Sequence, residues 1–188
     1  MKDRFVNEPK GILTLMALLV FSLPALGADL DIGAREAVGL FQMACIANAG
    51  DGEAQRSWMD AHHVPHLNSQ GAAIFLKNDS GVGYDASNTS GRFALTVLDN
   101  GVCTVFAEHA KDGDVISALE TSKAGVSRQN DHPDTTDPRL HHYDYILTHG
   151  GIDYTVIVST DTVPGHIQAM LSIARRVPNA TSMPSPQN

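Results

Sequence analysis

Signature motifs of common catalytic chemistries are missing from this sequence. It has no G-x-S-x-G turn of a serine hydrolase, no phosphate-binding P-loop and no glycine-rich dinucleotide fingerprint. With two cysteines in the whole chain, a zinc site built on four cysteines is excluded by number. A catalytic site assembled from distant residues would leave no local motif, so the sequence excludes these motif-bearing classes only.

Basic residues are also scarce. The chain has 13 Lys and Arg against 21 Asp and Glu, which gives a formal net charge of −8. Apart from Arg175 and Arg176, the basic residues beyond residue 27 are scattered. Binding to a phosphate backbone needs clustered Lys and Arg, so we expect no nucleic-acid partner.

Long hydrophobic runs are limited to one segment near the N-terminus. The apolar residues of 12–21 follow Lys2, Arg4 and Lys10, and they are fewer than the roughly 20 that a membrane-spanning helix needs. Pro24 ends the run, and small residues follow at the two positions that a signal peptidase reads, Ala25 and Gly27. We therefore predict a secretory signal peptide at 1–27, with an uncleaved anchor or a wrongly assigned start of the chain as the alternatives.

Cleavage after residue 27 would leave 161 residues with a formal charge of −9, because three basic and two acidic residues are lost. We predict a single α+β domain over 28–177 and a disordered tail over 178–188, which has neither charge nor periodicity. No second apolar stretch reaches membrane-spanning length. We expect a protein that is soluble in the periplasm or outside the cell.

Both cysteines, Cys45 and Cys103, lie in the predicted domain. An even number of cysteines in an oxidising compartment favours one disulfide, with two buried free thiols as the alternative.

Hydrophobic periodicity predicts four helices, over 34–49, 53–62, 112–125 and from 164 to about 174. Two β-hairpins are predicted, one around Asn100-Gly101 (93–98 and 102–107) and one around Gly150-Gly151 (143–147 and 152–158). We predict a short strand at 72–76 and a polar loop at 127–138, which contains Pro133 and Pro138. These elements predict an α+β fold, a mostly antiparallel sheet of about five strands from two hairpins plus a short strand, with four helices packed on it.

The two hairpins differ in the polarity of their faces. A two-residue turn in the first hairpin places Phe93 with Phe106 and leaves Cys103 on the opposite face, and both faces are apolar. In the second hairpin one face is polar, with His142, Asp144, Thr148, Asp153, Thr155 and Ser159. We predict that helices cover both faces of the first hairpin and that the second hairpin presents its polar face to solvent or to a partner.

This contrast yields the leading functional hypothesis, an exported binding or accessory protein such as an inhibitor, an immunity factor or an envelope-assembly factor. We predict that a protein partner in the cell envelope binds at His142, Asp144, Asp153 and Thr155, with the 127–138 loop beside it. This interpretation involves no cofactor and favours a protein that is not an enzyme.

Histidines support an alternative, a zinc- or copper-binding protein or a small metal-dependent hydrolase. His142 and Asp144 share a strand face as metal ligands would, and His62 or His66 could complete the site. The carboxylates of the 127–138 loop lack the alternation of a calcium-binding loop, so we interpret them as solvent-exposed.

Overall fold

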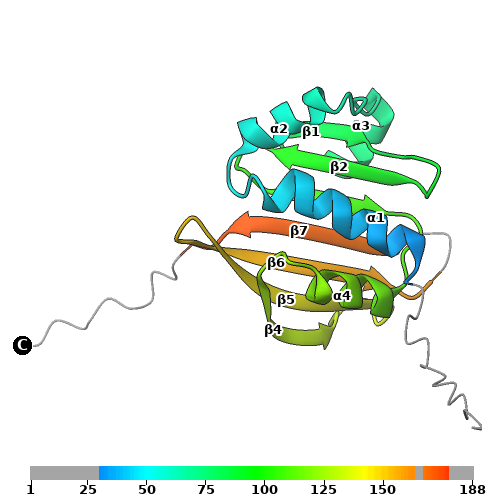
Figure 1. Ribbon diagram of the computed structural model, residues 1–188. Coiled ribbons are helices and arrows are strands. Elements are labelled where there is room, and N and C mark those ends of the chain that lie inside the picture. Colours follow the sequence, from blue (N-terminus) through cyan, green and yellow to red (C-terminus); the bar gives the residue numbers. More distant parts are fainter. Residues whose placement is uncertain (1–29, 164–166, 178–188) are drawn as a thin grey trace, which may run out of the picture.

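The computed structural model of this chain describes residues 30–163 and 167–177. Within these residues, seven strands form one antiparallel sheet in the order β1-β2-β3-β7-β6-β5-β4 (Figure 1). The strands are β1 (Gly81–Asp85), β2 (Phe93–Leu98), β3 (Cys103–Ala107), β4 (Val126–Pro133), β5 (Leu140–His149), β6 (Ile152–Asp161) and β7 (Ala169–Arg175). The helices are α1 (Ile32–Leu40), its π-helical continuation η1 (Phe41–Ile46), α2 (Gly52–Ala61), α3 (Ser69–Leu76) and α4 (Asp112–Thr121).

The predicted fold class is confirmed: an α+β fold in which four helices pack on an antiparallel sheet. The sheet has seven strands rather than about five. Both hairpins and the helices at the predicted positions 34–49, 53–62 and 112–125 are present. The predicted signal peptide, the predicted tail and the start of the predicted last helix lie outside the described residues.

Two predicted elements have the opposite type. The segment predicted as a strand at 72–76 belongs to α3, which begins after Asn68, whose side chain accepts a hydrogen bond from the Gly71 amide at 2.8 Å. The segment predicted as a helix beyond residue 167 contains β7, which pairs with β3 on one side and β6 on the other. Both are short apolar runs, whose periodicity fits a helix or a buried strand equally well, and tertiary pairing decides between them.

The predicted loop at 127–138 is also wrong over most of its length, because β4 occupies Val126–Pro133. In general, a proline disrupts the hydrogen bonding of a central strand. Here β4 is at the edge of the sheet, and Pro133 is its last residue. Its missing amide hydrogen therefore removes no essential hydrogen bond.

The predicted turn of the first hairpin is one residue too short. Cys103 pairs with Val97, so the loop has three residues and ends at Gly101, which has φ +83°. A one-residue change of register reverses every side chain of the second strand. As a result Cys103 shares a face with Phe93, and Phe106 lies on the other face.

We call the face that carries Cys103 the inner face and the one that carries Phe106 the outer face. The helices α1, α2 and α4 lie over the inner face (Figure 1), and η1 contacts β3 and β7 there. The core between them includes fully buried residues from the helices and from the inner face, among them Phe41, Met59, Leu119, Val105, Leu171, Val156 and Tyr145. Among the described residues, the helix on the outer face is α3, which contacts β1 and β2.

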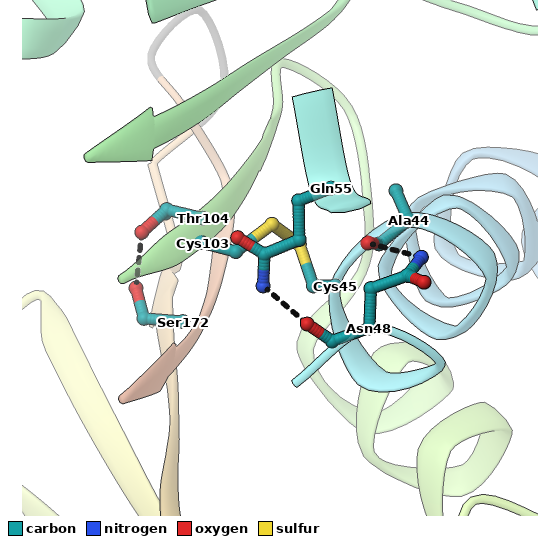
Figure 2. Close-up of a disulfide and its surroundings, with 7 residues drawn as sticks. All are labelled: Ala44, Cys45, Asn48, Gln55, Cys103, Thr104 and Ser172. Atoms are coloured by element: carbon teal, nitrogen blue, oxygen red, sulfur yellow. Dashed lines mark hydrogen bonds between the residues drawn. A yellow bond between two sulfur atoms is a disulfide. The ribbon is translucent and has the colours of Figure 1, made fainter. Parts of the chain in front are cut away.

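The predicted disulfide is confirmed. Cys45 of η1 is bonded to Cys103 at the start of β3, with Cα atoms 5.5 Å apart (Figure 2). Beside it, the fully buried Gln55 of α2 donates from Nε2 to the main-chain oxygen of Asn48 at 3.2 Å. The disulfide therefore joins the first helical segment to the centre of the sheet, and the buried amide connects that segment to α2.

Candidate binding face

The outer face of the second hairpin is open. On β5 and β6 the inner residues Tyr145, Val156 and Val158 are fully buried, whereas most of the outer residues between them are partly or fully exposed. The observed register places His142 opposite Ser159 and Thr148 opposite Asp153. The hairpin therefore has the apolar and polar faces that its alternating sequence predicts.

All four residues of the predicted binding site lie on this outer face, but they do not form one cluster. Asp144 is opposite Ile157, four residues along β6 from Asp153, a separation of about 13 Å along a strand. His142 and Asp144 lie toward the β4 edge and the β4–β5 connection. Asp153 and Thr155 lie toward the Gly150-Gly151 turn.

His142 connects two residues that are not among the four predicted site residues: Ser159 of the predicted polar face and Asp134 of the predicted 127–138 loop. Its Nδ1 lies 2.8 Å from the hydroxyl oxygen of Ser159, and its Nε2 lies 2.9 Å from Oδ2 of Asp134. Ser159 comes from the neighbouring strand β6, and Asp134 comes from the connection that follows β4. Three separate segments therefore meet at one imidazole ring.

The hydrogen-bonding capacity of these groups determines the neutral form of the ring. A carboxylate only accepts, so Nε2 carries the proton and donates to Asp134, and Nδ1 accepts from the Ser159 hydroxyl. This order resembles the polarised serine of a Ser-His-Asp hydrolase, with the two ring nitrogens exchanged. Ser159 is only 7% exposed, however, so its hydroxyl is poorly placed to attack a substrate in solution. We interpret the chain of hydrogen bonds as a clasp that holds the β4–β5 connection on the sheet.

Asp134 is the centre of that connection. Its Oδ1 accepts hydrogen bonds from the Thr136 amide, the Thr136 hydroxyl and the Asp137 amide, at 2.7, 2.7 and 2.8 Å. The Thr136 hydroxyl, followed by His142, holds the pKa of the Asp134 carboxyl far below its usual range. Nearby, hydrogen bonds from Arg139 lower the pKa of Asp137 to about 2. The prediction that these carboxylates are merely solvent-exposed is therefore incorrect for Asp134.

Asp144 has a different partner. Its Oδ2 lies 3.5 Å from Nε2 of His132 on β4, and the rings of His132 and His142 are 5.6 Å apart. Asp144 thus remains on the outer face beside the imidazole rings of His132 and His142.

The second pair of predicted residues borders a shallow hollow. Asp153 accepts a hydrogen bond from the Thr148 hydroxyl at 2.7 Å. Thr155 contributes to a hollow of about 300 Å³ that extends over β6 and β7 to the end of the described chain, lined also by Ile157, Ser172, Ala174, Arg175, Arg176 and Val177. Ile157 in this hollow is 37% exposed, which gives the polar face an apolar centre.

The residues of the metal hypothesis are not brought together. His66 packs against Tyr84 of β1, with ring centroids 4.9 Å apart, and His62 stacks on Trp58 of α2. Four strands separate β1 from β5, which carries His142 and Asp144. Within residues 30–163 and 167–177, no group of three or more His, Cys, Asp or Glu side chains is arranged to hold a metal ion.

Comparisons with models of protein families, with curated proteins and with solved structures gave no match to this chain. Over the described residues, the helices are too short or too polar for any of them to cross a membrane. The Cys45–Cys103 disulfide is consistent with an oxidising compartment.

Proposed function

We propose that this chain is an exported binding or accessory protein that holds a protein partner on the outer face of β5, β6 and β7. An inhibitor, an immunity factor or an envelope-assembly factor would fit this role. The observation that carries the proposal is the contrast between the two faces of this half of the sheet. Helices α1 and α4 and η1 bury the inner face, whereas the outer face keeps exposed and half-buried side chains around Ile157.

The chemistry of the face indicates the surface that it would fit. Asp144 and Asp153 place two carboxylates on either side of Ile157 and Thr155. A complementary partner presents basic residues opposite the carboxylates and an apolar side chain opposite the hollow. Such an arrangement resembles the polar rim and apolar centre of protein–protein interfaces.

The features that suggest export support the same role. Residues 1–27 have the pattern of a signal peptide, and a disulfide in the domain is typical of exported proteins. Sequencing of the N-terminus of protein recovered from the periplasm or medium tests this part directly. The expected first residue is Ala28.

Site-specific photo-cross-linking tests the binding face. A photo-reactive amino acid in place of Thr155, expressed in the native cell, should give one discrete cross-linked product with a protein. The double variant Asp144→Lys/Asp153→Lys should lose that product, because it reverses both charges of the complementary surface. Asp153 is exposed and Asp144 is half-buried, so the double variant should keep its free energy of unfolding within about 0.5 kcal/mol of the wild type.

A matched control places the same photo-reactive residue at Arg35, which is exposed on α1 at the other side of the molecule. This position should give no product. A Thr155 product that persists unchanged in the charge-reversed variant would overturn the proposal, and so would an identical product from position 35.

A further inference from the structure

A second surface feature lies at the opposite end of the sheet, where α3 crosses the outer face. A cavity of about 740 Å³ separates this helix from the ends of β1, β2 and β3. This volume is within the range of small-molecule binding sites, about 300–1,000 Å³.

The floor of the cavity follows from the register of the strands. Asp85, Ala94 and Phe106 lie side by side on the outer face of β1, β2 and β3. The next pair along the same face is Arg92 and Glu108, whose side chains form an ion pair at 3.3 Å. The floor is therefore apolar in the middle and charged at its edges.

The walls are apolar and unusually exposed. Ile74 of α3 is 60% exposed, and Ile167, which precedes β7, is 39% exposed. Phe75 packs its ring against Phe106 with centroids 4.9 Å apart, and Leu67 lies over Gly83, where a Cβ atom would come within 2.8 Å of it. These two contacts support α3 above the sheet, yet α3 buries none of its eight residues, although its second half is apolar. An apolar ligand in the cavity would cover the apolar side chains that α3 leaves exposed to solvent.

The charged residues around the cavity indicate the sign of the charge that a ligand would carry. Arg92 and Glu108 neutralise each other. Asp85 accepts a hydrogen bond from the Ser87 amide at 3.1 Å, and within the described part of the chain it forms no ion pair with a basic side chain. One uncompensated negative charge therefore remains at the edge of an apolar cavity, in a chain whose net charge is −8.

We propose that this cavity binds a small amphipathic cation, a molecule with one apolar chain or ring system and one ammonium group. The ammonium group pairs with Asp85, and the apolar part extends across Ala94 toward Phe75 and Phe106 beneath α3. This site is separate from the protein-binding face around Thr155.

Three probes with the same ten-carbon chain distinguish charge selection from simple hydrophobic binding: decyltrimethylammonium, decanol and decanoate. Isothermal titration calorimetry with the full domain should rank their affinities in that order. An exposed ion pair changes an affinity by up to roughly fivefold, so the cation should bind about that much more tightly than the alcohol. Shifts of the Ala94 and Phe106 amide resonances should locate the bound chain in the cavity.

Two variants and one control complete the test. Asp85→Asn should weaken cation binding about fivefold and leave decanol unchanged. Ile74→Gln, at a position of α3 that is 60% exposed, should weaken the binding of all three probes. Asp79→Asn, at an exposed acid just after α3, should change none of them. Tightest binding of decanoate, a cation preference that survives Asp85→Asn, or probe binding insensitive to Ile74→Gln would each overturn the proposal.

Discussion

The phenolic hydroxyl of Tyr154 on β6 donates a hydrogen bond to the main-chain oxygen of Ala49 at 2.9 Å, across 105 residues of sequence. Both residues are buried. The bond attaches the turn that follows η1 to the far half of the sheet. Because this turn also sets the direction of α2, the contact links the N-terminal helices to a strand formed much later in the chain.

This contact makes Gly50 intolerant of a side chain. Its φ is +77°, and a Cβ atom there would lie 2.7 Å from the Tyr154 oxygen. Gly50→Ala should therefore destabilise the domain by about 2 kcal/mol, from backbone strain and from the displaced hydroxyl, as measured by urea denaturation. Gly150→Ala is the matched control, because Gly150 also has positive φ but open space around it. If both variants lost the same free energy of unfolding, the contact between position 50 and Tyr154 would not be the cause.

The disulfide should stabilise the domain mainly through the unfolded state. It closes a segment with a sequence separation of 58, for which chain entropy gives about 4 kcal/mol. We expect Cys103→Ser to lower the free energy of unfolding by 2–4 kcal/mol, roughly the range found for native disulfides. Reduction of the wild-type protein should have the same effect and should add nothing in the variant. Mass spectrometry that finds both thiols free in protein purified without a reductant would contradict this prediction.

Asp134 should titrate well below a normal aspartate. Its pKa is lower in the folded than in the unfolded state, so it contributes stability above the unfolded pKa of about 4, and this contribution is lost as the pH falls. Asp134→Ala should therefore lower the Tm most near pH 7, and the difference from wild type should shrink toward pH 3.

The Thr136 hydroxyl is the largest cause of the lowered pKa, and His142 is the second. NMR titration of the Asp134 carboxyl carbon should show the pKa rising in Thr136→Val and in His142→Ala. An unchanged titration in both variants would show that the clasp is not formed in solution.

Gln55 offers a test of the buried polar contact beside the disulfide. Its Oε1 is buried and finds no hydrogen-bond partner among the described residues, while its Nε2 donates to Asn48. Gln55→Glu removes the donor and buries a carboxylate, so it should cost at least about 2 kcal/mol at pH 7. The loss should diminish on acidification, because burial raises the pKa of a carboxyl group. Gln55→Met keeps the length of the side chain and should lower the free energy of unfolding less than Gln55→Glu at pH 7. A larger loss in Gln55→Met than in Gln55→Glu would contradict this prediction.

Local signals predicted much of this fold. The Asn-Gly and Gly-Gly turns located both hairpins, and alternation along β5 and β6 assigned their faces correctly. Local signals did not predict that α3 is a helix and β7 a strand, because the secondary structure of each short apolar run depends on where it packs in the folded sheet. A three-residue turn instead of a two-residue turn at Gly101 was enough to misplace Phe106, and with it the cavity beneath α3.

At the candidate binding face, too, the sequence predicted which residues share a strand face but not the contacts between distant segments. Strand alternation placed His142, Asp144, Asp153 and Thr155 on one surface. The same alternation placed Ser159 on this surface with His142. The contact of His142 with Asp134 joins β5 to the β4–β5 connection, and no spacing in the sequence indicates it. The two prolines near Asp134 argued for a loop, and only the edge position of β4 explains why Pro133 fits in a strand.

The position of β7 has a consequence for how the protein is made. Among the described residues it is the last strand, yet it lies between β3 and β6 and joins the two halves of the sheet. During synthesis, each half can form its own hairpins, but both keep an unpaired edge until residues 169–175 have emerged. A truncation before this strand would leave two open edges that can pair with other molecules. The chain therefore depends on its final strand, and a partner or chaperone that shields those edges would be most useful just before that strand arrives.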